Sequence, residues 1–215
     1  MIQATAHLMW CNEEYWAEKV LKAVLAASFD RILLCDCGSE DRTLEIAQGF
    51  SDPRLIIKPM GKLSPEQNGA VRQIMLDETA TPWAYQVDGD ELYPNGMLDK
   101  ILAVELPERA RTGFILLHEV ARTDEGLRIV SQTSGHRLHH KTSKWKASYP
   151  FETTQYFDQK EARFYFPNAV YGYHVHALPR SPLDGKTYFR AQKQQLRKYY
   201  LDLEILDKEL FQDMS

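Results

Sequence analysis

The sequence has no long hydrophobic segment and few cysteines, and each absence argues against a class of protein. No apolar run approaches the roughly 20 residues that span a bilayer. The chain starts with a strand-like segment, Ile2 to Met9, rather than the basic and then apolar layout of a signal peptide. Its three cysteines, Cys11, Cys35 and Cys37, are odd in number and clustered, which does not fit a disulfide framework. We therefore expect a cytoplasmic protein without a transmembrane segment, in which Cys35 and Cys37 are buried structural thiols rather than a zinc site.

An excess of positive charge is also missing. The formal net charge is −4 at pH 7, so there is no global basic field and a nucleic-acid partner is not expected. A local basic stretch, His136 to Lys146, is typical of solvated surface, although it would also suit a phosphorylated acceptor or nucleic acid. The hydrophobic fraction of 44% is ordinary for a protein with a packed core. No internal repeat or low-complexity linker divides the 215 residues, and we expect a single domain.

Strand-like and helix-like patterns alternate along the first hundred residues. Short apolar runs predict strands at residues 5–10, 31–35, 55–58 and 83–87. Apolar residues at helical spacing follow the first three of them, at residues 13–27, 44–50 and 65–79. Asn12 is placed to cap the first helix. This alternation of four strands with helices predicts an α/β fold, with a Rossmann-like, mostly parallel sheet flanked by helices.

After Pro107 the pattern changes. Residues 113–119 and 127–132 are strand-like, with Thr123 to Gly126 as the hairpin turn between them. Further strands are expected at residues 135–140 and 169–176, with loops and short elements over 141–168, and a basic amphipathic helix is expected from Thr187 to about Phe211. This half has too few core signals for an independent domain, so we interpret it as an extension of the same sheet.

The most informative segment is Trp83 to Leu92, with the sequence WAYQVDGDEL. An alternating apolar strand ends in three carboxylates, Asp88, Asp90 and Glu91, and Gly89 lets the backbone turn there. Open α/β sheets bind their ligands at the carboxyl ends of parallel strands. Crowded carboxylates repel one another unless a cation neutralises them, and oxygen ligands suit Mg²⁺ or Mn²⁺, which would in turn hold a phosphate. We predict a divalent-cation site here; a solvated strand-end turn is the alternative.

Two other polar clusters also follow predicted strands, at Cys11 to Glu14 and at Asp36 to Thr43. Because these strand ends share one edge of a parallel sheet, the clusters can converge with the acidic turn on a single crevice. Asp36 is placed to hydrogen-bond a base or a ribose. Gly38 and Ser39 would allow the backbone to approach a ligand closely.

Three segments resemble the motifs of family 2 glycosyltransferases, which have the GT-A fold. Residues 35–47, CDCGSEDRTLEIA, are similar to that family's VD-x-GS-x-D-x-T-x-EIA segment. Residues 83–91, WAYQVDGDE, are similar to its W-x-x-x-x-D-x-DE segment, which carries the Asp-x-Asp metal site. Residues 10–13, WCNE, resemble its x-x-NE opening after the first strand. The segments cover roughly residues 2–105, and the short transferases of the lipopolysaccharide-core type look most similar.

The resemblance implies a GT-A domain over residues 1–215, with a nucleotide-sugar-binding half at 1–105 and an acceptor-side half with a C-terminal helix at 106–215. It implies inverting transfer of a sugar from a nucleotide-diphosphate donor to a hydroxyl acceptor, which could be a glycan or a lipid-linked molecule. The donor-binding residues that it implies are Asn12, Glu13, Asp36, Gly38, Ser39 and Asp88. It also implies that Asp88 and Asp90 bind Mn²⁺ or Mg²⁺. Many members have a second acid where this chain has Cys37.

Inversion requires a general base that deprotonates the acceptor hydroxyl. Members of the subgroup carry a His-Glu segment after an Arg-Leu segment, and Arg137-Leu138 and Phe151-Glu152 occur in that order here. We therefore predict Glu152 as the catalytic base. Glu119 and Asp124 are its rivals, and a surface acid without a catalytic role is the alternative.

His174 and His176 are two residues apart on an apolar strand and would face the same side. Relatives often place a histidine near this position, against the metal or the diphosphate, so we predict both as metal ligands and prefer His176. Structural histidines held by hydrogen bonds are the alternative. Arg180, Lys186 and Arg190 follow and could neutralise the leaving diphosphate, with a solvated helix face as the alternative.

Three rival functions share parts of this pattern. A haloacid-dehalogenase-type phosphatase also ends an apolar strand in Asp-x-Asp, but on its first strand and without the acid that Glu91 supplies here. A sugar nucleotidyltransferase would carry a Gly-rich phosphate loop after the first strand, and this chain has none there. A non-catalytic nucleotide- or carbohydrate-binding protein would keep the fold without the base, and this alternative stays open.

Overall fold

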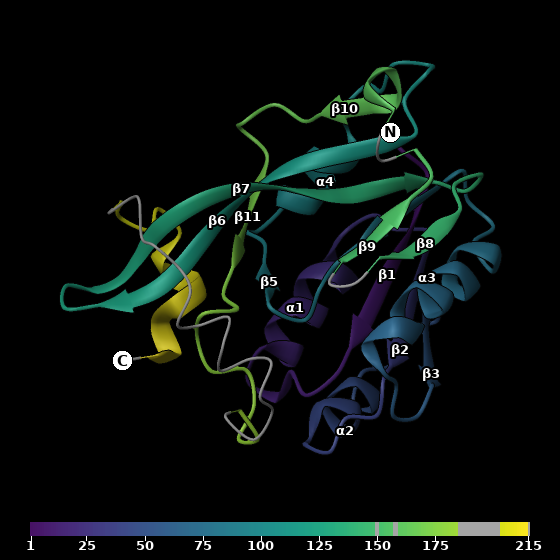
Figure 1. Ribbon diagram of the computed structural model, residues 1–215. Coiled ribbons are helices and arrows are strands. Elements are labelled where there is room, and N and C mark those ends of the chain that lie inside the picture. The colour runs from purple at the N-terminus through teal and green to yellow at the C-terminus, as the bar shows by residue number, and fades with distance from the viewer. Residues whose placement is uncertain (149–150, 157–158, 185–202, 215) are drawn as a thin grey trace.

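The first half of the chain is a regular α/β unit. The computed structural model describes residues 1–148, 151–156, 159–184 and 203–214 (Figure 1). Its first elements alternate in the order β1 (Ala4–Trp10), α1 (Glu14–Ala26), β2 (Arg31–Asp36), α2 (Thr43–Gln48), β3 (Leu55–Pro59), η1 (Pro65–Gln67), α3 (Asn68–Asp77), β4 (Trp83–Gln86), β5 (Glu91–Leu92) and α4 (Met97–Leu102). The predicted alternation of strands and helices is confirmed.

The second half adds long strands to the same sheet. Its elements are β6 (Thr112–Thr123), β7 (Gly126–His140), β8 (Trp145–Ser148), β9 (Phe151–Thr154), η2 (Lys160–Ala162), β10 (Arg163–Tyr165), β11 (Tyr171–His174) and η3 (Lys208–Met214). The main sheet has nine strands in the order β3-β2-β1-β4-β7-β6-β11-β5, with β10 also on β6. The pairs among β3, β2, β1 and β4 are parallel, whereas β7 joins both β4 and β6 in antiparallel fashion. The sheet is therefore a mixed one, with helices packed against its parallel part.

Strand β2 shows why the parallel part is buried on both faces. Ile32 and Leu34 belong to the large core cluster, which also contains Val20, Leu21 and Val24 of α1. Leu33 and Cys35 belong to a second cluster, which also contains Val71 and Met75 of α3. Alternate residues of a strand face opposite sides, so these two clusters lie on opposite faces of the sheet. The predicted burial of Cys35 and Cys37 is confirmed, and it raises the pKa of the two thiols to about 11 and about 12, respectively.

The β6–β7 hairpin is longer than predicted. The turn at residues 123–126 is confirmed, but residues 135–140 continue β7 instead of forming a separate strand, because pairing with β6 persists to His139. The end of the hairpin projects away from the α/β half, and the C-terminal segment lies beside it (Figure 1). Leu203 bridges Ile129 of β7 through two backbone hydrogen bonds.

Two predicted helix features differ in the structure. The expected helix from Thr187 to Phe211 lies largely outside the described residues, and its described part is an extended stretch at Leu203 followed by the 3₁₀ helix η3, so an α-helix there is wrong. Asn12 does not cap α1: Glu13 is the N-cap residue, and Asn12 has φ 56° with its side chain turned to another loop. Within the described residues, no helix is long and apolar enough to cross a membrane.

Candidate functional site

The acidic turn predicted after β4 lies in the structure at the carboxyl edge of the sheet. The Val87 amide donates to the His7 carbonyl of β1 at 2.9 Å, and the Glu91 amide then closes the turn on the Asp88 carbonyl at 3.1 Å. Gly89 is required by close packing, because a Cβ added there would lie 2.3 Å from Cγ of Glu13. The turn therefore brings the acids that follow β4 against the residue that caps α1.

Strand register brings three distant residues into one row beside this turn. Glu91 of β5 is paired with His174 of β11, and His174 is paired in turn with Glu119 of β6. The Val175 amide also donates to the Asp90 carbonyl at 2.9 Å. We call Glu13, Asp88, Asp90, Glu119, His174, His176 and Arg180 the acidic centre.

Asp90 is neutralised by side chains of the chain itself. Its side chain is only 4% exposed, and Oδ2 accepts a hydrogen bond from Nη1 of Arg180 and lies 3.5 Å from Nε2 of His174. Burial alone would raise the pKa of Asp90, but Arg180 and His174 outweigh it and hold the pKa well below its usual range. Asp90 is therefore ionised and already paired.

Asp88 is paired in the same way, with two other arginines. Its Oδ1 accepts from Arg72 at 2.9 Å, and its Oδ2 lies 3.3 Å from Nη2 of Arg137. Nε2 of the Gln86 side chain also donates to Asp88. Burial opposes ionisation of Asp88, but Arg137 and Arg72 lower its pKa overall.

The third acid of the turn, Glu91, is buried against Arg137 and Tyr93. It is fully buried, accepts from Nε of Arg137 at 2.7 Å and from the Tyr93 hydroxyl at 3.0 Å. Burial raises the pKa of Glu91 despite the Arg137 partner. Its role is to fix Arg137, which reaches Asp88.

The two predicted histidine ligands do converge on this centre. Nδ1 of His174 and Nδ1 of His176 each lie 3.0 Å from an oxygen of Glu119, and the two nitrogens are 3.1 Å apart. Burial lowers the pKa of His174, but Asp90 and Glu119 together raise it to about 10. Burial likewise opposes ionisation of Glu119, and the hydrogen bonds from His174 and His176 reverse that effect and lower its pKa. The sequence thus predicted the two histidines of this group, but it suggested Glu119 as a rival catalytic base and not as their partner.

These side chains suit a divalent cation. One candidate ligand set is Glu119 with His174 and His176, whose ligand atoms all lie within 4.8 Å of one another. The other is Asp90 with Nε2 of His174. One ion cannot use both nitrogens of His174, so the two sets are alternatives. Mixed nitrogen and oxygen donors favour Mn²⁺ over Mg²⁺, which prefers oxygen alone.

Outside the acidic centre, the carboxylate of Asp36 lies at the end of β2, and this residue is only 3% exposed. Its Oδ2 accepts from the amides of Gly38 and Ser39, each at 3.2 Å, while its buried Oδ1 has no hydrogen-bond partner among the described residues. Gly38 has φ 82°, and a Cβ there would lie 2.6 Å from the backbone of Lys62, so only glycine fits. The buried, unpaired oxygen is the kind of acceptor that a ligand N–H or O–H would satisfy.

Hydrogen bonds tie the loops after β1 and β2 together. The Asn12 amide donates to Oγ of Ser39 at 3.0 Å, and the Glu40 amide donates to Oδ1 of Asn12 at 2.8 Å. The Glu13 amide donates to Oγ1 of Thr43 at 2.7 Å. The predicted donor residues Asn12, Asp36, Gly38 and Ser39 therefore lie together, whereas the Glu13 side chain belongs to the acidic centre.

The three candidate bases lie in different parts of the structure. Glu152 lies on β9, and its side chain is outside the described residues, so its role stays a prediction. Asp124 lies in the exposed turn of the β6–β7 hairpin, five residues along the chain from Glu119. Glu119 alone of the two rivals lies in the acidic centre.

Arg72 is a candidate functional residue that the sequence analysis missed. It lies on α3, is 4% exposed, and its Nε and Nη1 atoms have no hydrogen-bond partner among the described residues. A charged residue between Val71 and Met75, on the buried face of an amphipathic helix, was the available signal. Its guanidinium lies against Asp88 and offers further donors to an anion.

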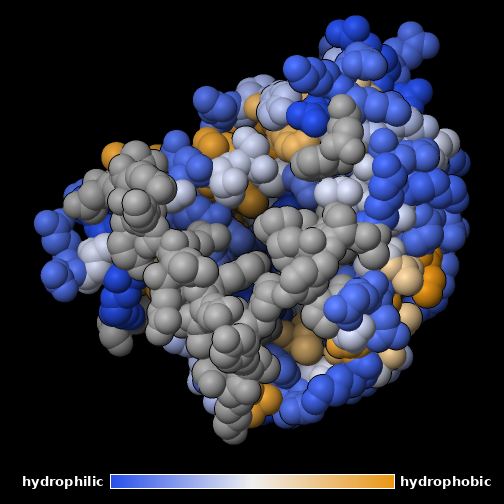
Figure 2. All heavy atoms as spheres, viewed as in Figure 1, coloured by the Kyte–Doolittle hydropathy of each residue, from blue (hydrophilic) through white to orange (hydrophobic). Residues whose placement is uncertain are grey.

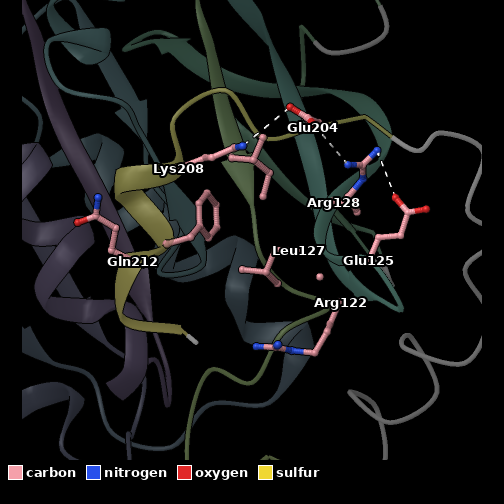
Figure 3. Close-up of a pocket in the computed structure, with 10 residues that line it drawn as sticks. Arg122, Glu125, Leu127, Arg128, Glu204, Lys208 and Gln212 are labelled. Carbon is pink, nitrogen blue, oxygen red and sulfur yellow. Dashed lines mark ion pairs between the residues drawn. The ribbon is translucent and has the colours of Figure 1, made fainter.

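Elsewhere, a cavity of about 440 Å³ lies between the end of the β6–β7 hairpin and η3. Arg128 reaches Glu125 and Glu204 at 3.9 and 4.0 Å across its wall, and Lys208 reaches Glu204 at 3.9 Å (Figure 3). None of its lining residues belongs to the acidic centre. On the face in Figure 2, hydrophilic residues predominate among those described, and hydrophobic ones form small separate groups.

No family model matches the chain, and no curated protein matches its sequence. Among solved structures, S. aureus TarS 1-349 is similar with a TM-score of 0.54 and 14% identity, over 81% of this chain and 61% of that one. A second S. aureus TarS structure gives a TM-score of 0.52 at 14% identity, over 81% of this chain and 37% of that one. The fold is GT-A.

A mannosyltransferase, PcManGT from Pyrobaculum calidifontis in complex with GDP-Man and Mn²⁺, gives a TM-score of 0.45 at 15% identity, over 53% of this chain and 35% of that one. This chain thus spans 61% of the TarS 1-349 chain and smaller shares of the other two.

Proposed function

We propose that this protein is a glycosyltransferase that moves a sugar from a nucleotide-diphosphate donor to a hydroxyl acceptor with inversion. The observation that carries the proposal is the placement of Asp36 and the acidic centre at one carboxyl edge of a GT-A sheet. Asp36 offers a buried oxygen that no other described residue satisfies, and the centre offers carboxylates and imidazoles. A nucleoside and its diphosphate require these two kinds of group next to each other.

In this proposal the donor is held by its two ends. Oδ1 of Asp36 accepts a hydrogen bond from the base or the ribose, and Gly38 and Ser39 let the nucleoside lie close to the backbone. Asn12 holds the Ser39 loop in place. Arg72 lies beside Asp88, and two of its guanidinium nitrogens have no hydrogen-bond partner in the described part of the chain, so it would face the donor's negative charge.

The proposed metal, Mn²⁺ or Mg²⁺, would be bound by Asp90 with His174, or by Glu119 with His174 and His176; Asp88 is the remaining predicted ligand. When bound, it would neutralise the diphosphate of the donor and of the leaving group. These side chains would hold the ion in one place. Asp88 is better placed to orient Arg72 and Arg137 than to bind an ion, because both of its oxygens are already paired.

The transfer itself is a single displacement. The acceptor oxygen attacks the anomeric carbon, the bond from that carbon to the diphosphate oxygen breaks, and the hydroxyl proton goes to a base. Glu152 is the proposed base, from the order of motifs in the acceptor-side half. Glu119 is the rival, and its pairing with two imidazoles disfavours it, since a lowered pKa weakens a base.

A non-catalytic nucleotide- or carbohydrate-binding protein is the second candidate. It is favoured by the internal pairing of Asp88 and Asp90, which leaves neither acid in need of a metal. A thermal-shift screen of nucleoside diphosphates with and without Mn²⁺ tests the shared binding site, because a ligand of the native state raises the melting temperature. Slow release of nucleoside diphosphate from a nucleotide sugar, lost in Asp90→Asn, would identify the enzyme. Binding without any turnover, across all donors and Mn²⁺ concentrations, would favour the binding protein.

A further inference from the structure

Hydrogen bonds of its main chain fix the position of Arg180, independently of its side-chain contacts. Its amide donates to the Asp184 carboxylate, and its carbonyl accepts from the Tyr15 amide at 2.9 Å. Nε1 of Trp16 donates to the neighbouring Pro179 carbonyl, also at 2.9 Å. The turn that carries Arg180 is therefore fixed to the first turn of α1.

From this turn the guanidinium enters the acidic centre. Nη1 of Arg180 contacts Oδ2 of Asp90 and lies 3.0 Å from Oε1 of Glu13. The side chains of these two acids are 4% and 6% exposed, and that of Arg180 is 17% exposed. One nitrogen thus bridges two buried carboxylates from separate loops, a position that a bound cation would otherwise occupy.

We propose that Arg180 is a built-in counter-cation of Asp90, which a divalent metal ion must displace in order to bind there. This inference rests on the proposed function for the identity of the displacing ion. Oδ2 of Asp90 cannot accept a hydrogen bond from the guanidinium and coordinate a metal ion in the same direction. Two cations a few ångströms apart in a buried site also repel strongly. Arg180 therefore weakens metal binding in the absence of donor, and a donor diphosphate relieves this by accepting the displaced guanidinium.

The test measures Mn²⁺ binding without nucleotide, from the electron paramagnetic resonance signal of free Mn²⁺ titrated with full-length protein. Arg180→Gln should bind Mn²⁺ at least about tenfold more tightly than the wild type, because the competing charge is gone. Arg180→Lys should stay near the wild type. Arg109→Gln, at an exposed arginine outside the centre, is the matched control and should change nothing.

A second variant guards against misfolding of Arg180→Gln. Asp184→Ala keeps the guanidinium but removes the acceptor of the Arg180 amide, so it should tighten Mn²⁺ binding by a smaller factor. The gain in Arg180→Gln should vanish when Asp90→Asn is added. Equal Mn²⁺ affinity in the wild type, Arg180→Gln and Asp184→Ala would overturn the proposal.

The outcome is separable from that of the proposed function. If nucleoside diphosphates shift the melting temperature but Arg180→Gln gains no Mn²⁺ affinity, the counter-cation proposal is wrong and the proposed nucleotide-sugar site stands. If Arg180→Gln gains affinity but no nucleoside diphosphate binds any variant, the counter-cation stands and the glycosyltransferase proposal fails.

Discussion

Asp36 and the pair Asp88 and Asp90 lie at the same edge of the sheet but are satisfied differently. Asp36 uses one oxygen for two loop amides and keeps the other buried and unpaired among the described residues. Asp88 and Asp90 are each paired with arginines of the chain itself. The Asp36 site can therefore accept a ligand as it stands, whereas the Asp88 and Asp90 site must exchange an internal cation for an external one.

The largest expected effect is a loss of turnover from a substitution outside both acidic sites. Glu152→Gln should lower kcat by ~10²–10⁴-fold, the usual loss for a general base. Donor affinity should hardly change, because Asp36 and the acidic centre supply it. Steady-state kinetics with separate donor titration would measure this. If Glu152→Gln keeps its turnover and Glu119→Gln loses it, the base is Glu119 and the acidic centre itself performs the proton transfer.

Removing an arginine that pairs with the buried acids of the turn should lower the free energy of unfolding. Arg137→Met leaves Glu91 fully buried without its charge partner, which costs about 3–5 kcal/mol in comparable buried pairs. Urea unfolding measures the change. Arg42→Met is the control, because its pair with Glu45 is exposed and should contribute little. Equal stability of the two variants would mean that the internal pairing is not structural.

Oδ1 of Asp36, which has no hydrogen-bond partner within the described ranges, should matter for ligand binding rather than for stability. Asp36→Ala should weaken nucleoside-diphosphate binding by about 1–3 kcal/mol, the usual effect of losing a buried hydrogen-bond partner. Asp77→Ala, at an exposed acid on α3, should leave the affinity unchanged. Calorimetric titration measures both. An Asp36→Ala protein with wild-type affinity for every diphosphate would remove the distinction between the two sites.

A pH dependence of stability is expected from His7 on β1, whose carbonyl accepts from the Val87 amide just before the acidic turn. His7 is 3% exposed, and burial, with Arg72, lowers its pKa to about 3. The unfolded chain binds this proton near the ordinary pKa of about 6.5, so unfolding takes up a proton between these values. The free energy of unfolding should therefore fall by about 1.4 kcal/mol per unit as the pH drops from about 6.5 towards 3. His7→Gln should flatten this slope, and an unchanged slope would contradict the assignment.

Local patterns predicted the first half of the molecule well. The alternation of strands and helices, the acidic turn after β4 and the hairpin at residues 123–126 all depend on residues near one another in the chain. The acidic centre depends on distant ones. Glu119 meets His174 only because β6 and β11 pair in one register, and Arg180 meets Asp90 across 90 positions of sequence. No local periodicity specifies such a register.

The wrong predictions have the same cause. Residues 203–211 have helical spacing, but Leu203 is drawn into a bridge with Ile129 of the hairpin. Asn12 has the right side chain for a helix cap, but it caps the Glu40 amide of the neighbouring loop instead. Tertiary partners overrode local preference in both places.

The most direct test of the central claim is the binding of nucleoside diphosphates at this edge of the sheet. Thermal unfolding of the wild type and of Asp36→Ala should be followed with UDP, GDP and other nucleoside diphosphates, each with and without Mn²⁺. At least one diphosphate should raise the melting temperature of the wild type in a concentration-dependent way, more so with Mn²⁺, and Asp36→Ala should lose most of this shift. No shift with any nucleoside diphosphate, or an equal shift in both proteins, would contradict the central claim.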